Sequence, residues 1–265
     1  MKEIHYFFAP EAELSDELPD DEARHAAKVL RLHSGDNIVL INGKGTFYKA
    51  VVADISPRSC RYDILEAEKQ KPAWSGRIHL AVAPTKNMDR TEWLVEKAAE
   101  IGFDELSFVC SRFSERRTLK LDRIERILVS AVKQSHKAFL PKVNDMISFD
   151  EFIRKGNLAG ARYIAHCLNE NVDYSALRPD VVSPNPDVRH YLPAVMENGD
   201  MTVFIGPEGD FAIEEVNAAM SEHFIPVSLG NSRLRTETAA LYAVMLMNLR
   251  NSLREDGHTP VDVFK

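Results

Sequence analysis

Two stretches in the C-terminal half of the chain place glycine and charged side chains directly after apolar runs. The first is Phe204-Ile205-Gly206-Pro207-Glu208-Gly209-Asp210-Phe211, and the second runs from residue 227 to 240. Each pattern predicts a strand, a loop in which glycine lets the backbone approach a ligand, and a helix whose first amides can donate hydrogen bonds. Because ligands of open α/β sheets bind at the carboxyl ends of strands, the two loops could hold one small ligand between them.

A simpler interpretation of these loops stays open. The glycines could be ordinary turn residues and Thr236 a simple helix cap, since a GxxG spacing alone is weak evidence. Neither GxGxxG nor GxxxxGK[ST] occurs, which disfavours a nucleotide-dependent oxidoreductase and a P-loop. The nine histidines and three cysteines contain no HExxH and no CxxC, so we predict no metal site.

Composition indicates a globular protein of one or two domains. The chain has 265 residues, 45% of them hydrophobic and 28% charged. Its net charge of −7 disfavours nucleic acid as a partner, but residues 112–142 hold nine basic and three acidic side chains. That segment could contact nucleic acid or be a solvated helix face.

Location is also suggested by composition. The N-terminus has no apolar signal-peptide core, and the longest apolar run, Ala239 to Met247, is too short to span a bilayer. The cysteines are few and far apart, as is typical of a reducing compartment. We therefore expect a cytoplasmic protein that does not enter the membrane.

The N-terminal quarter predicts β structure. An apolar run at 38–41, the turn Asn42-Gly43-Lys44-Gly45 and a second run at 47–52 form a hairpin signal, and 61–65 alternates as a third strand would. A polar segment with Pro72 and Gly76 follows. We predict a small β-barrel domain over residues 1–72 and a second domain over 73–265.

The second domain alternates predicted strands with predicted helices. Asp89 and Glu92 have capping-box spacing before one helix, which Gly102 ends, and Pro141 closes a second, longer helix. Four prolines predict an irregular loop over 178–198. Predicted strands lie at 78–83, 106–110, 162–168, 201–205 and 227–229, and later helices at 214–221 and 236–250. This alternation favours a mostly parallel sheet covered on both faces.

The pairing of GPEG after one strand with LG…LRTETA after the next resembles the SPOUT methyltransferases, specifically the 16S ribosomal RNA (uracil-N3) methyltransferase family. The segment His25-Ala-Ala-Lys28-Val-Leu-Arg31, the Glu96-to-Gly102 helix end, Gln134-Ser135 and Pro141 are similar to other parts of that family. The resemblance implies an α/β fold whose C-terminal SPOUT-type parallel sheet carries a trefoil knot from about Met201, with a PUA-like β-barrel domain before it. It also implies a homodimer.

The resemblance further implies the cofactor S-adenosylmethionine and a target at N3 of a uridine in the decoding region of 16S rRNA in the small ribosomal subunit. A methyl transfer to N3 needs a cation to orient the base and a route for its proton. Arg235 is the candidate for orientation, and Glu208 and Glu237 are weaker catalytic candidates with structural roles as the alternative. The implied cofactor-binding residues are Ile205, Gly206, Pro207, Glu208, Gly209, Leu229, Gly230, Leu234, Arg235, Thr236 and Thr238.

Two basic clusters are candidates for RNA contact, although each residue alone could be solvated surface. They are Arg24, Lys28 and Arg31 before the predicted hairpin, and Lys86, Arg112, Arg116 and Arg117 at the ends of predicted strands. The sequence departs from the family pattern at Asp210, where a glycine is usual, and at Ala212, where a capping serine is frequent. Asp tolerates a left-handed backbone better than most residues.

Asn231-Ser232 and His136-Lys137 also vary from the family pattern.

Two alternative functions stay open: a knotted methyltransferase acting on a ribose 2′-oxygen or on tRNA, and a non-catalytic ribosome assembly factor.

Overall fold

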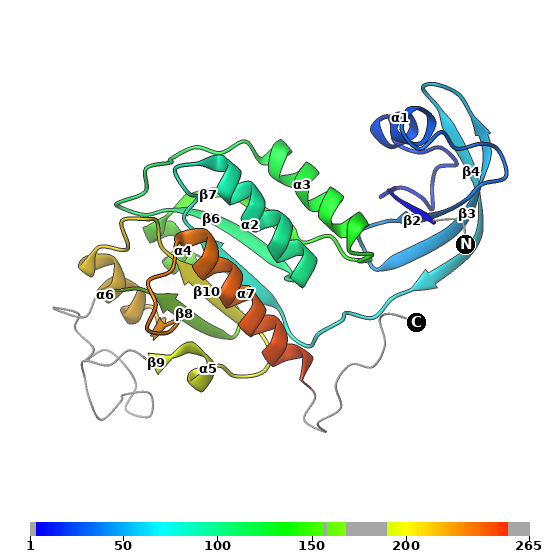
Figure 1. Cartoon of the computed structure of the whole chain (residues 1–265). Coiled ribbons are helices and arrows are strands. Elements are labelled where there is room, and N and C mark those ends of the chain that lie inside the picture. The colour runs from blue at the N-terminus through cyan, green and yellow to red at the C-terminus, as the bar shows by residue number, and fades with distance from the viewer. Residues whose placement is uncertain (1–3, 156–157, 168–189, 254–265) are drawn as a thin grey trace. The chain divides into compact units, whose positions relative to one another are not determined.

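The computed structural model describes residues 4–155, 158–167 and 190–253, and it divides into two compact units (Figure 1). One unit comprises Met1–Ala73 with Leu128–Leu140, and the other comprises Trp74–Ile127 with Pro141–Lys265. They are called the N-terminal unit and the C-terminal unit below.

The N-terminal unit is built on a four-stranded sheet of order β1-β2-β3-β4. Its strands are β1 (His5–Phe8), β2 (Asn37–Ile41), β3 (Thr46–Ile55) and β4 (Cys60–Lys69). The β1 strand is parallel to β2 and the other pairs are antiparallel, so the hairpin predicted at Asn42–Gly45 is confirmed. Alternation places Phe7, Leu40 and Tyr48 on one face, where they pack with helix α1 (Asp20–Lys28).

Sequence periodicity does not indicate β1, and Arg31 lies beyond α1 with a left-handed φ of 53°. A segment more than fifty residues further along the chain, Leu128–Leu140, completes this unit. Helix α3 (Leu121–Gln134) is shorter than predicted, because His136 turns the chain with φ of 51°. The segment then bonds to the hairpin: Gly45 N–H donates to Ala138 O at 3.0 Å.

A parallel seven-stranded sheet forms the C-terminal unit, in the order β7-β6-β5-β10-β8-β11-β9. The strands are β5 (Ile78–Val82), β6 (Glu105–Cys110), β7 (Lys142–Ser148), β8 (Ala161–Ala165), β9 (His190–Tyr191), β10 (Met201–Ile205) and β11 (Ile225–Ser228). The predicted α/β architecture is confirmed, and every observed pair in this sheet is parallel. The trefoil knot stays a prediction.

Helices cover both faces of this sheet. On one face α2 (Met88–Ile101) and α7 (Thr236–Ser252) lie side by side (Figure 1). On the other face α4 (Phe149–Lys155) and α6 (Ile213–Ser221) pack on the sheet through one aromatic-rich cluster that includes Phe152, Phe204 and Phe211. Central strands such as β5 and β10 are buried on both faces, which explains why they appear in the sequence as mainly apolar runs with one buried polar residue each, His79 and Thr202.

Several local predictions need correction. Asn87, and not Asp89, caps α2, because its side chain accepts the Asp89 amide at 3.0 Å. Part of the loop predicted over 178–198 is regular: β9 is followed by the short helix α5 (Leu192–Val195), which Pro193 opens. The prolines at 179, 184 and 186 lie outside the described residues. In the described part of the chain, no helix combines the length and apolarity needed to cross a membrane.

A row of buried polar side chains crosses the C-terminal sheet near the start of its strands. His79 Nε2 lies 2.9 Å from Ser107 Oγ, and His79 Nδ1 lies 3.3 Å from Thr202 Oγ1. Asn144 Nδ2 donates to the same Ser107 hydroxyl at 2.8 Å. Burial, aided by the charges of Arg77 and Lys142, lowers the pKa of His79 to about 3. The imidazole is therefore neutral, and it lies at the opposite ends of the strands from the loops described next.

Candidate active site

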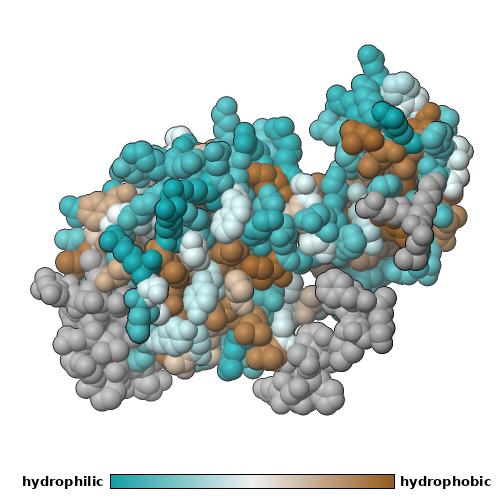
Figure 2. Space-filling model, viewed as in Figure 1, coloured by the Kyte–Doolittle hydropathy of each residue, from teal (hydrophilic) through white to brown (hydrophobic). Residues whose placement is uncertain are grey.

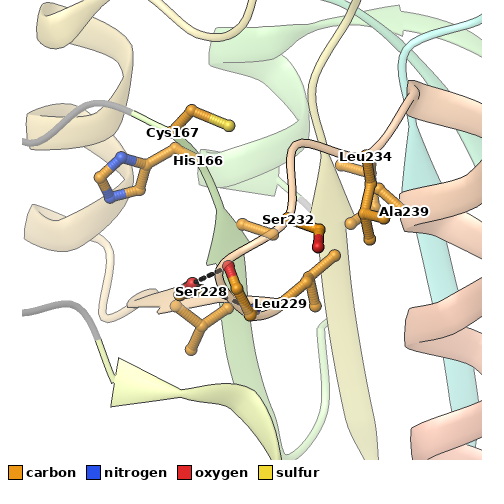
Figure 3. Close-up of a pocket in the computed structure, with 11 residues that line it drawn as sticks. His166, Cys167, Ser228, Leu229, Ser232, Leu234 and Ala239 are labelled. Carbon is orange, nitrogen blue, oxygen red and sulfur yellow. Dashed lines mark hydrogen bonds between the residues drawn. The ribbon is translucent and has the colours of Figure 1, made fainter.

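Five loops meet at the carboxyl ends of β5, β6, β8, β10 and β11, and a pocket opens among three of them (Figure 3). Its empty volume, which includes space open to solvent, is about 410 Å³. The lining is apolar with a few polar groups: Ala165, His166, Cys167, Ile205, Val227, Ser228, Leu229, Gly230, Ser232, Leu234 and Ala239. A pocket of this kind suits a flat, partly apolar ligand held by backbone groups.

Four of the eleven predicted cofactor residues line this pocket: Ile205, Leu229, Gly230 and Leu234. The other seven are not among its lining residues. Gly206, Pro207 and Thr236 are buried, whereas Glu208, Gly209, Arg235 and Thr238 are exposed.

Sequence reasoning misses the contribution of β8. Ala165, His166 and Cys167 form one wall of the pocket, and Figure 3 shows His166 and Cys167 at the end of that strand. The β8 strand lies between β10 and β11, so its end must fall between the two glycine loops. The strand itself is predictable, but its place in the sheet is not visible in the sequence.

The turn at Gly230 requires glycine. Its φ is 118°, a conformation that other residues rarely adopt. The Ser228 hydroxyl both accepts from the Gly230 amide and donates to the Gly230 carbonyl, each at 3.2 Å. This turn presents backbone groups of the second loop at the rim of the pocket.

Side chains fasten the loops after β5, β6 and β10 to one another. The Lys86 amide donates to Glu208 Oε1 at 2.9 Å, and the Arg116 guanidinium donates to the Thr85 and Lys86 carbonyls at 3.3 and 2.8 Å. Glu215 accepts from the amides of Arg112 and Ala212 at 2.8 and 2.9 Å. A carboxylate on α6 thus caps the helix that lacks a capping serine.

Asp210 has a φ of 64°, so the expectation that this position accommodates Asp in a left-handed conformation is confirmed. Its Oδ2 accepts the Cys167 amide at 2.8 Å, and its Oδ1 accepts the Phe211 amide at 2.9 Å. The carboxylate therefore joins the end of β8 to the loop after β10.

The three catalytic candidates differ in their environments. Arg235 precedes α7 and is exposed, and within the described part of the chain its side chain has no hydrogen bond or ion pair. Glu208 is exposed, although its Oε1 accepts a hydrogen bond from the backbone amide of Lys86. Glu237 is buried with Oε1 3.7 Å from Arg90 Nε, and its Oε2 has no partner among the described residues. Arg235 is thus the candidate most available to a bound substrate.

The basic candidates are mostly at the surface with exposed acidic neighbours. In the N-terminal unit, Arg24 pairs with Asp21 at 2.5 Å, and Lys28 and Arg31 are exposed. In the C-terminal unit, Lys86 pairs with Glu115 and Arg112 with Glu214, both at 3.3 Å, and Arg117 donates to Arg112 O at 3.4 Å. Exposed pairs contribute little to stability, so they can exchange for phosphate. Arg116 differs because its guanidinium is occupied by two carbonyls.

Two family models match the chain in the order of its units. Residues 18–65 match an RNA methyltransferase PUA domain, and residues 72–248 match an RNA methyltransferase domain. The chain therefore belongs to this RNA methyltransferase family, as the resemblance predicts.

The individual relatives to which the chain is similar are named as methyltransferases of ribosomal RNA. The chain is 28% identical over 242 residues to "Ribosomal RNA small subunit methyltransferase E" of Rickettsia conorii, covering 91% of this chain and 92% of the relative. Among crystal structures, a probable rRNA-methyltransferase from Porphyromonas gingivalis is 41% identical with a TM-score of 0.81, covering 94% and 98% of the two chains. The small-subunit methyltransferase E of Neisseria gonorrhoeae, bound to S-adenosyl methionine, is 28% identical with a TM-score of 0.76, covering 93% and 98%.

Proposed function

We propose that this protein transfers a methyl group from S-adenosylmethionine to N3 of a uridine in the decoding region of 16S rRNA, in the small ribosomal subunit. The observation that supports it most is the pocket at the carboxyl ends of β8, β10 and β11, in a chain whose relatives are small-subunit rRNA methyltransferases. The proposal takes the cytoplasm as the site of action.

The residues present fit the cofactor. Ile205, Leu229 and Leu234 offer apolar surface for a purine ring, and the turn at Gly230 offers backbone polar groups. When bound, the cofactor supplies an electrophilic methyl group. The chain must then orient the base, keep the pocket closed to water and accept one proton.

Arg235 is suited to orient the base. Its exposed guanidinium has no partner in the described part of the chain and stands at the start of α7, one residue beyond pocket-lining Leu234. A guanidinium there can bind the uracil carbonyl oxygens and stabilise negative charge as the N3 proton leaves. For the proton, Glu208 is the accessible carboxylate, since Glu237 is buried against Arg90.

We assign RNA binding to the N-terminal domain, residues 1–72, and to the loop cations of the methyltransferase domain, residues 73–265. The candidates are Arg24, Lys28, Arg31, Lys86, Arg112, Arg116 and Arg117. Of these, Arg116 binds RNA least directly, because two backbone carbonyls already occupy its guanidinium.

We also propose a homodimer. An apolar stripe is exposed along the end of α7: Met245 and Leu249 lie on the helix and Leu253 directly follows it, and the three are 50%, 57% and 48% exposed. Figure 2 shows hydrophobic surface among hydrophilic residues on the face over α2 and α7. Such a stripe on a well-formed helix is typical of a surface that a second copy covers.

The test is transfer of label from methyl-labelled S-adenosylmethionine to small ribosomal subunits from a strain lacking this gene. We expect label as 3-methyluridine on nucleoside chromatography. We expect Arg235→Ala to lower kcat/KM by about 100-fold or more without changing thermal stability. Arg233→Ala is the matched control, because Arg233 is also exposed and lies two residues earlier.

The other outcomes discriminate among functions. Label on a ribose 2′-oxygen or in tRNA would identify a related knotted methyltransferase instead. Subunit binding without label transfer or cofactor binding would identify an assembly factor.

A further inference from the structure

Asp210 lies at a sharp turn in the loop after β10. Its amide donates to Pro207 O at 3.0 Å, which closes the turn, and its φ of 64° is left-handed. The next residue, Phe211, is buried with its ring 4.8 Å from that of Phe204. The carboxylate of Asp210 therefore projects from a backbone that packing holds in place.

The group that this carboxylate binds lies at the end of a neighbouring strand. The ladder between β8 and β11 ends at the pair Ala165 and Val227, and His166 still bonds weakly to Val227 O at 3.4 Å. Cys167 follows, beyond the ladder, and its amide is satisfied by Asp210 Oδ2 at 2.8 Å. A backbone donor at a strand end needs such a partner, and a charged acceptor makes a strong one.

Cys167 also lines the pocket, together with Ala165 and His166 (Figure 3). One wall of the pocket is thus fixed at its outer end by a carboxylate from the adjacent loop.

We propose that Asp210 is a positioning residue for the cofactor: it holds the Cys167 end of β8 in the conformation that binds S-adenosylmethionine. This inference rests on the proposed cofactor and not on the methylated atom. Asp210 acts through the backbone of Cys167 and takes no part in the chemistry.

Two substitutions separate this role from general stabilisation. Asp210→Gly keeps the left-handed turn without strain and removes the carboxylate. Asp210→Asn keeps an acceptor oxygen and tolerates the same backbone. A matched surface control is Glu214→Gln, which removes an exposed carboxylate from the neighbouring helix.

The experiment measures three quantities on the full chain: hydrogen exchange of the Cys167 amide, the Kd for S-adenosylmethionine by calorimetry, and kcat with KM for methyl transfer. For Asp210→Gly we expect about tenfold faster exchange and about tenfold weaker binding, the loss of one charge-assisted hydrogen bond. The KM for S-adenosylmethionine rises equally, and kcat and the melting temperature stay unchanged. Asp210→Asn should give intermediate values, because its single neutral oxygen can accept the Cys167 amide only without the help of charge, whereas Glu214→Gln stays within about twofold of the parent.

Faster exchange with unchanged Kd would overturn the proposal, because the contact would then not serve the cofactor. A loss of affinity that follows a fall in melting temperature would overturn it in favour of a structural role. If the parent binds S-adenosylmethionine but makes no 3-methyluridine, the proposed function fails and this inference stands. If the parent does not bind S-adenosylmethionine, both fail.

Discussion

Replacing His79 should remove part of the acid sensitivity of the C-terminal unit. His79 is buried between Ser107 and Thr202, and burial is the main cause that lowers its pKa to about 3 from 6.5. In the unfolded chain the imidazole regains its ordinary pKa. Between pH 6.5 and pH 3 the unfolded chain therefore binds a proton that the folded chain does not, so the free energy of unfolding falls as the pH falls.

The magnitude follows from the two pKa values. Each pH unit in that window costs up to about 1.4 kcal/mol, or about 2 kcal/mol between pH 6.5 and pH 5. His79→Gln should remove this contribution, because glutamine does not titrate and retains polar atoms for Ser107 and Thr202. The variant loses some stability at pH 7, yet its stability should vary less with pH than that of the parent.

The assay is urea unfolding at several pH values between 7 and 5, followed by tryptophan fluorescence. Both tryptophans, Trp74 and Trp93, lie in the C-terminal unit, so the signal reports the unfolding of that unit. The control is His33→Gln, since His33 is exposed in the N-terminal unit. An equal pH slope for His79→Gln and the parent would refute the reasoning.

Three further predictions concern the pocket, the turns and the helix surface. Iodoacetamide at pH 8 should not label Cys60, because burial raises the pKa of its thiol to about 11, but it should label the exposed Cys167. Bound S-adenosylmethionine should protect Cys167, because this residue lines the pocket. Peptide mass spectrometry measures the labelling, and labelling of Cys167 that the cofactor does not change would contradict the proposed cofactor site. Gly76→Ala should lower the free energy of unfolding, measured by urea titration, by more than about 2 kcal/mol, because the added Cβ would lie 2.3 Å from the backbone of Gly199. Gly199→Ala is the control: its added Cβ meets no neighbouring atom, so it should lower the free energy of unfolding less. Leu249→Glu should yield folded monomers in sedimentation, and an unchanged oligomeric state would exclude this face of α7 as the interface.

Strong periodicity made most elements of the C-terminal unit predictable. The buried strands, such as β5 and β10, are mainly apolar runs, and Gly102 marks the end of α2 as expected. The β7 strand is not predictable in this way, because at the sheet edge it mixes half-buried Val143 and Ile147 with polar residues. Its pairing with β6, and not its own composition, stabilises it as a strand.

The pocket was predictable only in part, because local sequence patterns identify strand ends but not the order of the strands in the sheet. Glycine loops identify the ends of β10 and β11, which supply Ile205, Leu229, Gly230 and Leu234 to the pocket. The wall at His166 and Cys167 depends on strand order, which results from long-range packing and leaves no local signal. The same limit applies to Leu128–Leu140, which joins the N-terminal unit although its sequence continues a helix of the other unit.

The acidic character of the chain does not oppose an RNA substrate at this site. Three carboxylates near the pocket, those of Glu208, Asp210 and Glu215, each accept backbone amides from the loops. These carboxylates thus hold the loops together. The amides that donate to them partly offset their negative charge, so the carboxylates repel an RNA phosphate less. The exposed loop cations Lys86, Arg112 and Arg117 are held by exposed acidic side chains or by weak contacts, so they can turn to a phosphate at little cost. Whether RNA can bind at this site therefore depends on which partners each charged side chain has, and the net charge of −7 is a weaker guide to the substrate.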